Sequence, residues 1–262
     1  MPKRSWYQIK AEGTGPAVIY LYGPIGQDWW GDGTSARDFA RDLDALGTRD
    51  VELRVNSEGG DVFEGYAMYS ALNRYKGKVT AFVDGLAASA ASFLILAADE
   101  VVMGQASCLF IHQAWTIAIG NADELRAVAE RLDVLDEQIT GIYTSHCDRD
   151  EEEVRETLRA TKLFSAEEAV EWGFASRIDE GLKAAASISR AGAHLLFKDQ
   201  VPDGIEVVDE ASGDADPIIE TVVDEPEGDG QEPAPEASGQ EPAAERVVAL
   251  ASNVYRLPER KV

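Results

Sequence analysis

The stretch "GLAASAASFLILAADE" (residues 85–100) places small residues around two serines and then becomes strongly apolar. A helix built from such a run has no polar face, so it must be buried inside the fold. The strand-like run "KVTAFVDG" (78–85) comes directly before it, and "EVVMGQASCLFIHQ" (100–113) follows as two short strands around a turn. Strand, buried helix and strand in this order predict an α/β domain.

The same alternation continues on both sides of this stretch. Apolar spacing and turn residues predict, in chain order, a strand over 17–26, a helix over 31–47, a strand over 50–57, a helix over 61–77, a long helix over about 123–146, and two helices with a closing strand over 151–179. The long helix is charged outside its apolar stripe, which is typical of a helix that reaches away from the core to meet a partner. Ser165 and Glu168 form a capping-box pattern at the start of the last helix.

The chain changes character beyond about Leu182. Residues 199–245 hold 16 acidic residues, no Lys or Arg, and six of the ten prolines. A self-repelling segment of this composition favours disorder. We therefore expect a folded domain over 1–190 and a disordered acidic tail over 191–245. The segment 246–262 regains apolar and basic residues and suits a short docking helix.

Composition narrows the classes of function. The net charge of −24 argues against nucleic-acid binding, because neutralising phosphates needs clustered Lys and Arg. The N-terminus lacks the apolar core of a signal peptide, and "FLILAA" is far shorter than the roughly 18 residues of a membrane span. Two cysteines are too few for a disulfide framework. We expect a cytoplasmic protein that binds neither membranes nor nucleic acid.

Ser89 is the first candidate for chemistry. Its neighbours are Gly and Ala, so the backbone around it is bare and a substrate carbonyl could approach. A serine nucleophile also needs a base within hydrogen-bond reach and donors for the oxyanion. The alternative is that these small residues only allow close helix packing, and local composition does not decide between the two.

His112 and the glycine pair Gly59–Gly60 supply what a nucleophile would need. His112 ends the strand-like run "CLFIHQ", where a side chain can emerge from a rigid element. Two glycines directly after a strand can present backbone N–H groups without a side chain in the way. Each alone is weak, since a single His is more often structural and a Gly-Gly pair is often an ordinary turn.

A metal site is the less favoured interpretation of the polar run "HCDRDEEE" (146–153). Its potential ligands are contiguous rather than spaced as in a zinc site. We predict a helix end and an acidic loop there, with no metal and no organic cofactor.

Taken together, "VNSEGGDVFEG", "VDGLAASAASFLILAADEVVM", "FIHQ" and "FSAEEAVEWGF" resemble, in order, the motifs of the Clp-type serine peptidases, the family of the ClpP proteolytic subunit. The resemblance covers roughly residues 17–179. It is closest to the shorter branch found in phage and prophage head-assembly modules, which often begin with a "SWY" like that at residues 5–7. The resemblance implies a crotonase-like α/β fold of repeated β-β-α units. It also implies homo-oligomeric rings of subunits that enclose the active sites, with the long helix joining one ring to another.

The resemblance also implies site residues. Ser89 falls on the nucleophile and His112 on the general base. Gly60 and Ala90 fall where backbone amides bind the oxyanion, with Gly59 beside the substrate. The family usually has proline at the position of Glu58.

No aspartate stands at the position where the family has the third residue of its catalytic triad. Counting back from "SAEEA" gives Thr157 at the expected position, with Glu156 one place earlier. Glu156 is therefore our predicted third member, with Asp148 and Asp150 as alternatives, and its other interpretation is a solvated charge on a helix face.

These features predict a serine endopeptidase that needs no ATP of its own. We expect a head-maturation protease that cleaves capsid or scaffold proteins in the cytoplasm or inside assembling heads. One alternative is a housekeeping proteolytic subunit fed by an ATP-driven unfoldase. The other is a catalytically silent ring or scaffold protein. An acyl-CoA enzyme of the crotonase type would share the fold, but its chemistry would not need the pair Ser89 and His112.

Overall fold

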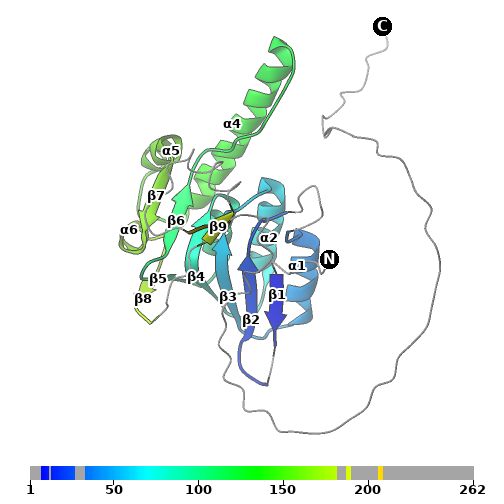
Figure 1. Cartoon of the computed structure of the whole chain (residues 1–262), viewed down its shortest axis with the longest axis vertical. Helices are drawn as coiled ribbons and strands as arrows, with labels where there is room; N and C mark the ends of the chain where they lie inside the picture. Colours follow the sequence, from blue (N-terminus) through cyan, green and yellow to red (C-terminus); the bar gives the residue numbers. More distant parts are fainter. Residues whose placement is uncertain (1–6, 12, 27–32, 182–186, 190–205, 209–262) are drawn as a thin grey trace, which may run out of the picture. The chain divides into compact units, whose positions relative to one another are not determined.

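The computed structural model describes residues 7–11, 13–26, 33–181, 187–189 and 206–208, and the first three ranges form the mixed α/β domain that the sequence predicts. An eight-stranded sheet runs in the order β1-β2-β3-β4-β5-β8, and β6 pairs with both β4 and β7 (Figure 1). Neighbouring strands are parallel except for β1 with β2 and β6 with β7. The strands are β1 (Tyr7–Lys10), β2 (Ala17–Tyr22), β3 (Val51–Ser57), β4 (Val79–Ala88), β5 (Glu100–Gly104), β6 (Cys108–Ile111), β7 (Lys162–Ser165) and β8 (Arg177–Asp179).

Helices make the crossovers that parallel strands require. A polar side chain at the N-cap accepts a hydrogen bond from a first-turn amide in five of them, and the capping box predicted at Ser165 and Glu168 is confirmed. The helices are α1 (Ala36–Ala45), α2 (Val62–Arg74), α3 (Ala90–Leu94) with the 3₁₀ turn η1 (Ile95–Ala97), α4 (Ala122–Thr144), α5 (Glu151–Ala160) and α6 (Ala166–Glu171).

The central strand β4 becomes fully enclosed along its length. From Val79 to Val83, buried and partly exposed residues alternate, as they do in β2 and β3. From Val83 to Ala88 every residue is buried. The first half pairs with β3 and β5, and the second half pairs with β6 and, at Ala87, with β3. A strand covered on both faces needs apolar or small side chains, which is what the run "GLAA" supplies.

The helix predicted from residue 85 is wrong in its start and its length. Strand β4 continues to Ala88, because Leu86, Ala87 and Ala88 pair in parallel with Cys108–Phe110 of β6. Helix α3 begins only at Ala90, covers five residues and passes into η1. The small residues that favour a helix locally are drawn into the sheet by this tertiary pairing. The result is a sharp strand-to-helix turn at residue 89.

The long helix predicted over 123–146 is confirmed as α4. It extends away from the sheet in Figure 1, and its C-terminal part returns to the core, where Ile139 and Tyr143 are buried. Val134 is 58% exposed, and the preceding segment exposes Ile117 and Ile119. An apolar surface on a projecting helix and its neighbouring segment is typical of an interaction region.

Most of the predicted acidic tail and the whole segment 246–262 lie outside the described residues. Strand β9 (Ser187–Ser189) pairs in parallel with β10 (Glu206–Val208) in a small separate sheet. Within the residues that the structure describes, no helix combines the length and the apolar character needed to cross a membrane.

Candidate active site

Ser89 stands at the turn between β4 and α3. Residues 83–88 and 90–96 are buried, whereas Ser89 itself is partly exposed. Its backbone has φ 53° and ψ −124°, a conformation rarely adopted by residues with a side chain. Such a conformation costs about 1–3 kcal/mol and persists only where surrounding contacts impose it. The fold therefore presents this one hydroxyl at the surface on a strained turn.

Hydrogen bonds on both sides hold the Ser89 turn. The Ser89 N–H donates to Phe110 O at 2.9 Å, which ties the turn to β6. The Ser89 carbonyl accepts from Ser92 N at 3.0 Å and from Ser92 Oγ at 2.5 Å. Tyr143 of α4 lies 2.6 Å from Ser92 Oγ through its hydroxyl. The strained backbone is thus fixed by the sheet and by α4.

His112 directly follows β6, the strand that pairs with the end of β4. Because these strands are parallel, Ser89 and His112 leave the sheet at the same edge. His112 Nδ1 lies 2.6 Å from Gln113 O, and Nε2 is buried without a hydrogen-bond partner in the part of the chain that the structure describes. If Nδ1 donates to that carbonyl, the proton is on Nδ1 and Nε2 carries the free lone pair. That lone pair is what a general base needs.

Burial sets the protonation state of His112. It lowers the pKa of the imidazole below its ordinary value of 6.5, although the hydrogen bond to Gln113 O and the charge of Asp136 act in the opposite direction. A lowered pKa keeps the ring neutral at neutral pH. The neutral ring can accept a proton from a serine hydroxyl.

The first glycine of the pair, Gly59, lies against the Ser89 turn. Gly59 has φ +87°, and a Cβ there would lie 2.5 Å from Ala88 O and 2.7 Å from Ala90 N. Ile25 N donates to Gly59 O and Asp61 N donates to Ile25 O, so this ladder does not use the Gly60 N–H. Gly60 itself is exposed with φ +147°. The structure thus places Gly59 against the backbone of the Ser89 turn, while the next residue, Gly60, lies against Ile25.

Hydrogen bonds also fix the segment that precedes the glycine pair. The fully buried Ser57 hydroxyl donates to Gly23 O at 2.6 Å and accepts from Gly59 N at 3.1 Å. Asn56 Oδ1 accepts from Leu86 N at 3.1 Å. These bonds join the ends of β2, β3 and β4 into one rigid edge.

The model of the Clp protease family matches residues 6–181 of this chain. The chain belongs to the Clp protease family. Clp proteases are peptidases, generally of the serine type, that act on protein substrates and are generally oligomeric. The mixed α/β domain fits the fold of this family.

The structure does not bring Glu156 of this Clp protease to His112. Glu156 is exposed on α5, and Thr157 beside it donates to Glu153 O within the same helix. Strand β6 pairs with β7 so that Ile111 faces Lys162, and continuing this register by one residue places Thr161 opposite His112. The position opposite His112 in this register thus carries a hydroxyl side chain, and it comes later in the chain than the position that the sequence count predicts.

The two alternative aspartates have structural contacts instead. Asp150 caps α5 by accepting from Glu153 N at 2.9 Å. Asp148 N donates to Trp172 O at 3.1 Å, beside the glycine that follows α6. Neither carboxylate is among the groups whose charge acts on His112.

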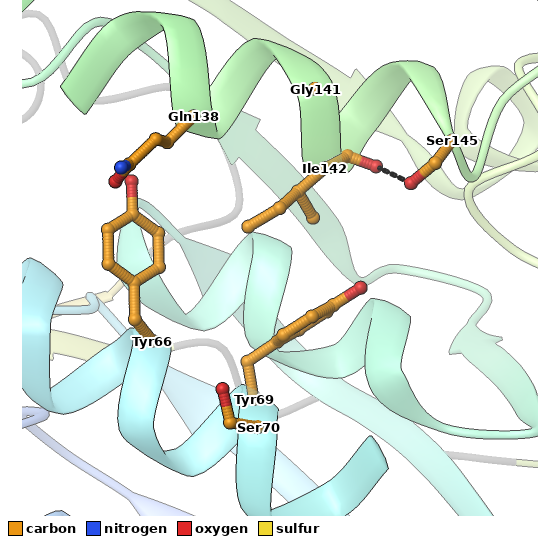
Figure 2. A pocket seen from close by; sticks show the side chains of 7 residues that line it. All are labelled: Tyr66, Tyr69, Ser70, Gln138, Gly141, Ile142 and Ser145. Carbon is orange, nitrogen blue, oxygen red and sulfur yellow. Dashed lines mark hydrogen bonds between the residues drawn. The ribbon is translucent and has the colours of Figure 1, made fainter. Parts of the chain in front are cut away.

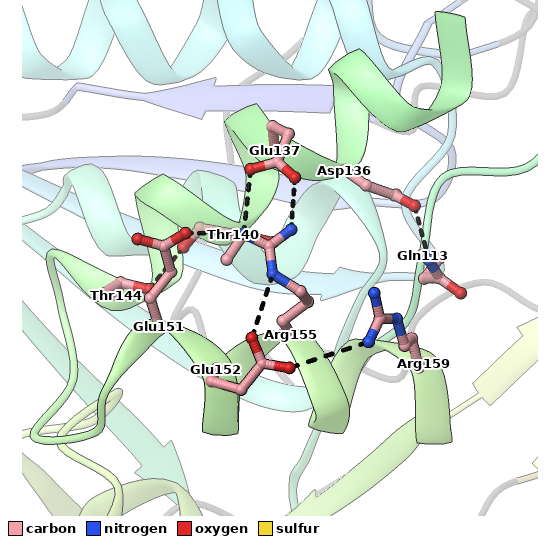
Figure 3. Close-up of polar contacts among 9 residues, drawn as sticks. All are labelled: Gln113, Asp136, Glu137, Thr140, Thr144, Glu151, Glu152, Arg155 and Arg159. Atoms are coloured by element: carbon pink, nitrogen blue, oxygen red, sulfur yellow. Dashed lines mark hydrogen bonds and ion pairs between the residues drawn. The ribbon is translucent and has the colours of Figure 1, made fainter. Parts of the chain in front are cut away.

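Asp136 of α4 is the carboxylate that sequence reasoning missed. Its charge raises the pKa of His112. It accepts hydrogen bonds from Gln113 Nε2 at 2.7 Å, the bond drawn in Figure 3, and from Ala114 N at 2.6 Å. Sequence offers only an acid on a helix rich in charge, so no local pattern distinguishes Asp136 from its neighbours.

Two cavities adjoin α4, and Ser89 and His112 line neither. One lies toward α5 and is lined by Asp136, Arg155 and Arg159 among others, with Arg155 held by Glu137 and Glu151 (Figure 3). The other lies between α2 and α4, where Tyr66, Tyr69 and Ile142 face one another (Figure 2). Across the described part of the chain, no three His, Cys, Asp or Glu side chains gather as metal ligands would.

Proposed function

We propose that the chain is a serine endopeptidase in which Ser89 is the nucleophile and His112 the general base, on a crotonase-like fold of repeated β-β-α units. The observation that supports this most directly is the strained, partly exposed Ser89 turn. Its N–H bonds to β6 two residues before His112, whose Nε2 has no hydrogen-bond partner among the described residues. Backbone strain of this kind gathers at functional sites.

The groups at this edge suffice for peptide-bond hydrolysis. Ser89 Oγ attacks the substrate carbonyl while His112 Nε2 takes the hydroxyl proton, and the Gly60 and Ala90 amides bind the oxyanion. The intermediate collapses, the C–N bond breaks, and His112 returns the proton to the leaving amine. Water then attacks the acyl ester as His112 takes its proton, and that proton goes back to Ser89 Oγ as the acid leaves. No metal or organic cofactor enters these steps.

We propose that the substrates are capsid or scaffold proteins of a phage or prophage head, cleaved by a homo-oligomeric ring in the cytoplasm or inside assembling heads. The resemblance of the motifs to the head-assembly branch supports this setting. The projecting α4 supports the ring, because its exposed apolar residues suit contact with another subunit. Partner unfoldases, where present, would consume the ATP.

A catalytically silent ring protein is the second candidate. It is favoured by one observation: the residue opposite His112 is Thr161 and carries no carboxylate. In this reading the turn at Ser89 would keep its geometry without an activated hydroxyl.

A fluorophosphonate probe separates these functions, since it bonds covalently to an activated serine. We expect labelling of the wild-type protein and none of Ser89→Ala, with strongly reduced labelling of His112→Ala. Co-expression with capsid and scaffold proteins should give cleaved products only with the wild type. Absence of labelling in the wild type would overturn the endopeptidase. Labelling without capsid cleavage, but with degradation of unfolded protein when an unfoldase is added, would favour the housekeeping role.

A further inference from the structure

Asp136 grips the segment that directly follows His112. One carboxylate oxygen accepts from the Ala114 N–H at 2.6 Å, and the other accepts from Gln113 Nε2 at 2.7 Å, the bond drawn in Figure 3. Both donors belong to the two residues after the histidine, and the acceptor comes from α4. A carboxylate that accepts two hydrogen bonds forms a strong, directional clamp.

This clamp acts on the carbonyl that the imidazole faces. Gln113 lies between His112 and Ala114, and its O lies 2.6 Å from His112 Nδ1. Holding the side chain of Gln113 and the amide of Ala114 fixes the peptide between them, and hence the direction of the Gln113 carbonyl. In a serine protease the partner of Nδ1 determines which nitrogen carries the proton and how the ring is oriented.

Among the groups around His112, Asp136 is the one suited to orienting the imidazole. Phe110 packs at 5.5 Å between ring centroids, and the register of β7 places the uncharged Thr161 opposite. The other charged groups near Asp136 line the cavity between α4 and α5: Asp133 and Glu137 from α4, and Arg155 and Arg159 from α5. Of the described residues, Asp136 alone has a charge that acts on His112.

A second feature points to the same place. The two residues other than glycine with positive φ in the described chain are Ser89 and Thr161, at 53° and 56°. One is bonded to β6 just before His112, and the other lies across from it. Strain on both sides of one side chain marks a site whose geometry is imposed by its surroundings.

We propose that Asp136 is the positioning residue of His112: through Gln113 and Ala114 it holds the Gln113 carbonyl at Nδ1, so that Nε2 faces Ser89 as the base. This rests on the proposed serine peptidase function. The Gln113 carbonyl takes the place of the triad carboxylate that the sequence lacks, and the charge of Asp136 stabilises the imidazolium from a greater distance.

The test is the pH dependence of fluorophosphonate labelling in the full-length protein. Asp136→Asn removes the charge and alters the clamp, while Asp136→Glu keeps the charge. Asp133→Asn is the matched control, because Asp133 lies on the same helix and lines the same cavity without bonding the segment. Thermal unfolding of each variant shows whether it is folded. Gln113→Ala, which loses only the side-chain bond, replaces Asp136→Asn if the latter does not fold.

We expect Asp136→Asn to label about tenfold to a hundredfold more slowly, as is common for residues that orient a catalytic group. The midpoint of its labelling rate against pH should move to lower pH, since removing a negative charge lowers the pKa of the imidazole. Asp136→Glu should recover part of the rate, and Asp133→Asn should match the wild type.

If Asp136→Asn is labelled at the wild-type rate and with the wild-type pH midpoint, while Ser89→Ala is not labelled, the role of Asp136 is overturned. The proposed peptidase function would be unaffected. An equal loss in Asp133→Asn, or a slower rate with an unmoved midpoint, would also overturn it. If the wild type itself does not label, the proposed function fails and this inference fails with it.

Discussion

Replacing Ser92 by alanine tests how the fold holds the Ser89 turn. Ser92 is fully buried, and its hydroxyl donates to Ser89 O at 2.5 Å. The same hydroxyl lies 2.6 Å from the hydroxyl of Tyr143. Since the Ser92 proton points to Ser89 O, Tyr143 must be the donor in the second bond. Burial raises the pKa of Tyr143, so its hydroxyl stays neutral and needs this acceptor.

The expected magnitudes follow from these two bonds. Ser92→Ala loses the bond to Ser89 O, worth about 1 kcal/mol, and strands the buried Tyr143 hydroxyl, which costs about 1–3 kcal/mol. The free energy of unfolding should therefore fall by about 2–4 kcal/mol. Tyr143→Phe keeps the bond from Ser92 to Ser89 and should cost about 1 kcal/mol. In the double variant no hydroxyl is stranded, so Tyr143→Phe should stabilise Ser92→Ala by about 1 kcal/mol.

Urea unfolding at one fixed chain concentration measures these differences, since subunit assembly would otherwise change the apparent stability. Fluorophosphonate labelling of the same samples should be slower in Ser92→Ala, because the strained turn loses a bond that fixes it. The reasoning is refuted if Tyr143→Phe destabilises Ser92→Ala as much as it destabilises the wild type.

Three further predictions concern the site and its support. Gly60→Ala places a methyl group onto a backbone carbonyl of the neighbouring segment, so labelling should fall by about 10²–10³, as for loss of an oxyanion donor; unchanged labelling would exclude this amide. The lowered pKa of His112 should keep the midpoint of wild-type labelling below pH 6.5, and a midpoint above that value would contradict its burial. Asp84→Ala leaves the Arg54 guanidinium without its buried partner and should cost about 3 kcal/mol in urea unfolding. The control Asp38→Ala removes a carboxylate that is only partly buried and pairs with the exposed Arg41, so it should cost under about 1 kcal/mol; equal losses would show that burial of the Arg54–Asp84 pair is unimportant.

Local sequence patterns were sufficient for most helices and strands, but not for β1, for β7 or for the end of β4 at Ala88. Alternation in "DVELRVNS" and helical spacing in α4 depend on neighbours along the chain, so β3 and α4 are predicted close to their observed bounds. The glycine pair and Ser89 are recognisable because bare backbone is itself visible in the sequence. The sequence also predicts that the glycine pair and Ser89 lie close together, since each follows a strand and parallel strands end at one edge of a sheet.

The rest depended on contacts between distant parts of the chain. Pairing with β6 extended β4 to Ala88 and forced the turn at Ser89. The register of β6 and β7 placed Thr161, rather than Glu156, opposite His112. Asp136 reaches the histidine segment from 22 residues away along the chain, through the packing of α4.

The amino-acid sequence by itself thus determined the α/β class, the nucleophile and base candidates and their glycine neighbours, because each is written in residues adjacent along the chain. Only the tertiary structure placed a carboxylate, that of Asp136, against the segment that follows the imidazole. Strand register and helix packing choose that partner, and neither is encoded in any short run of residues.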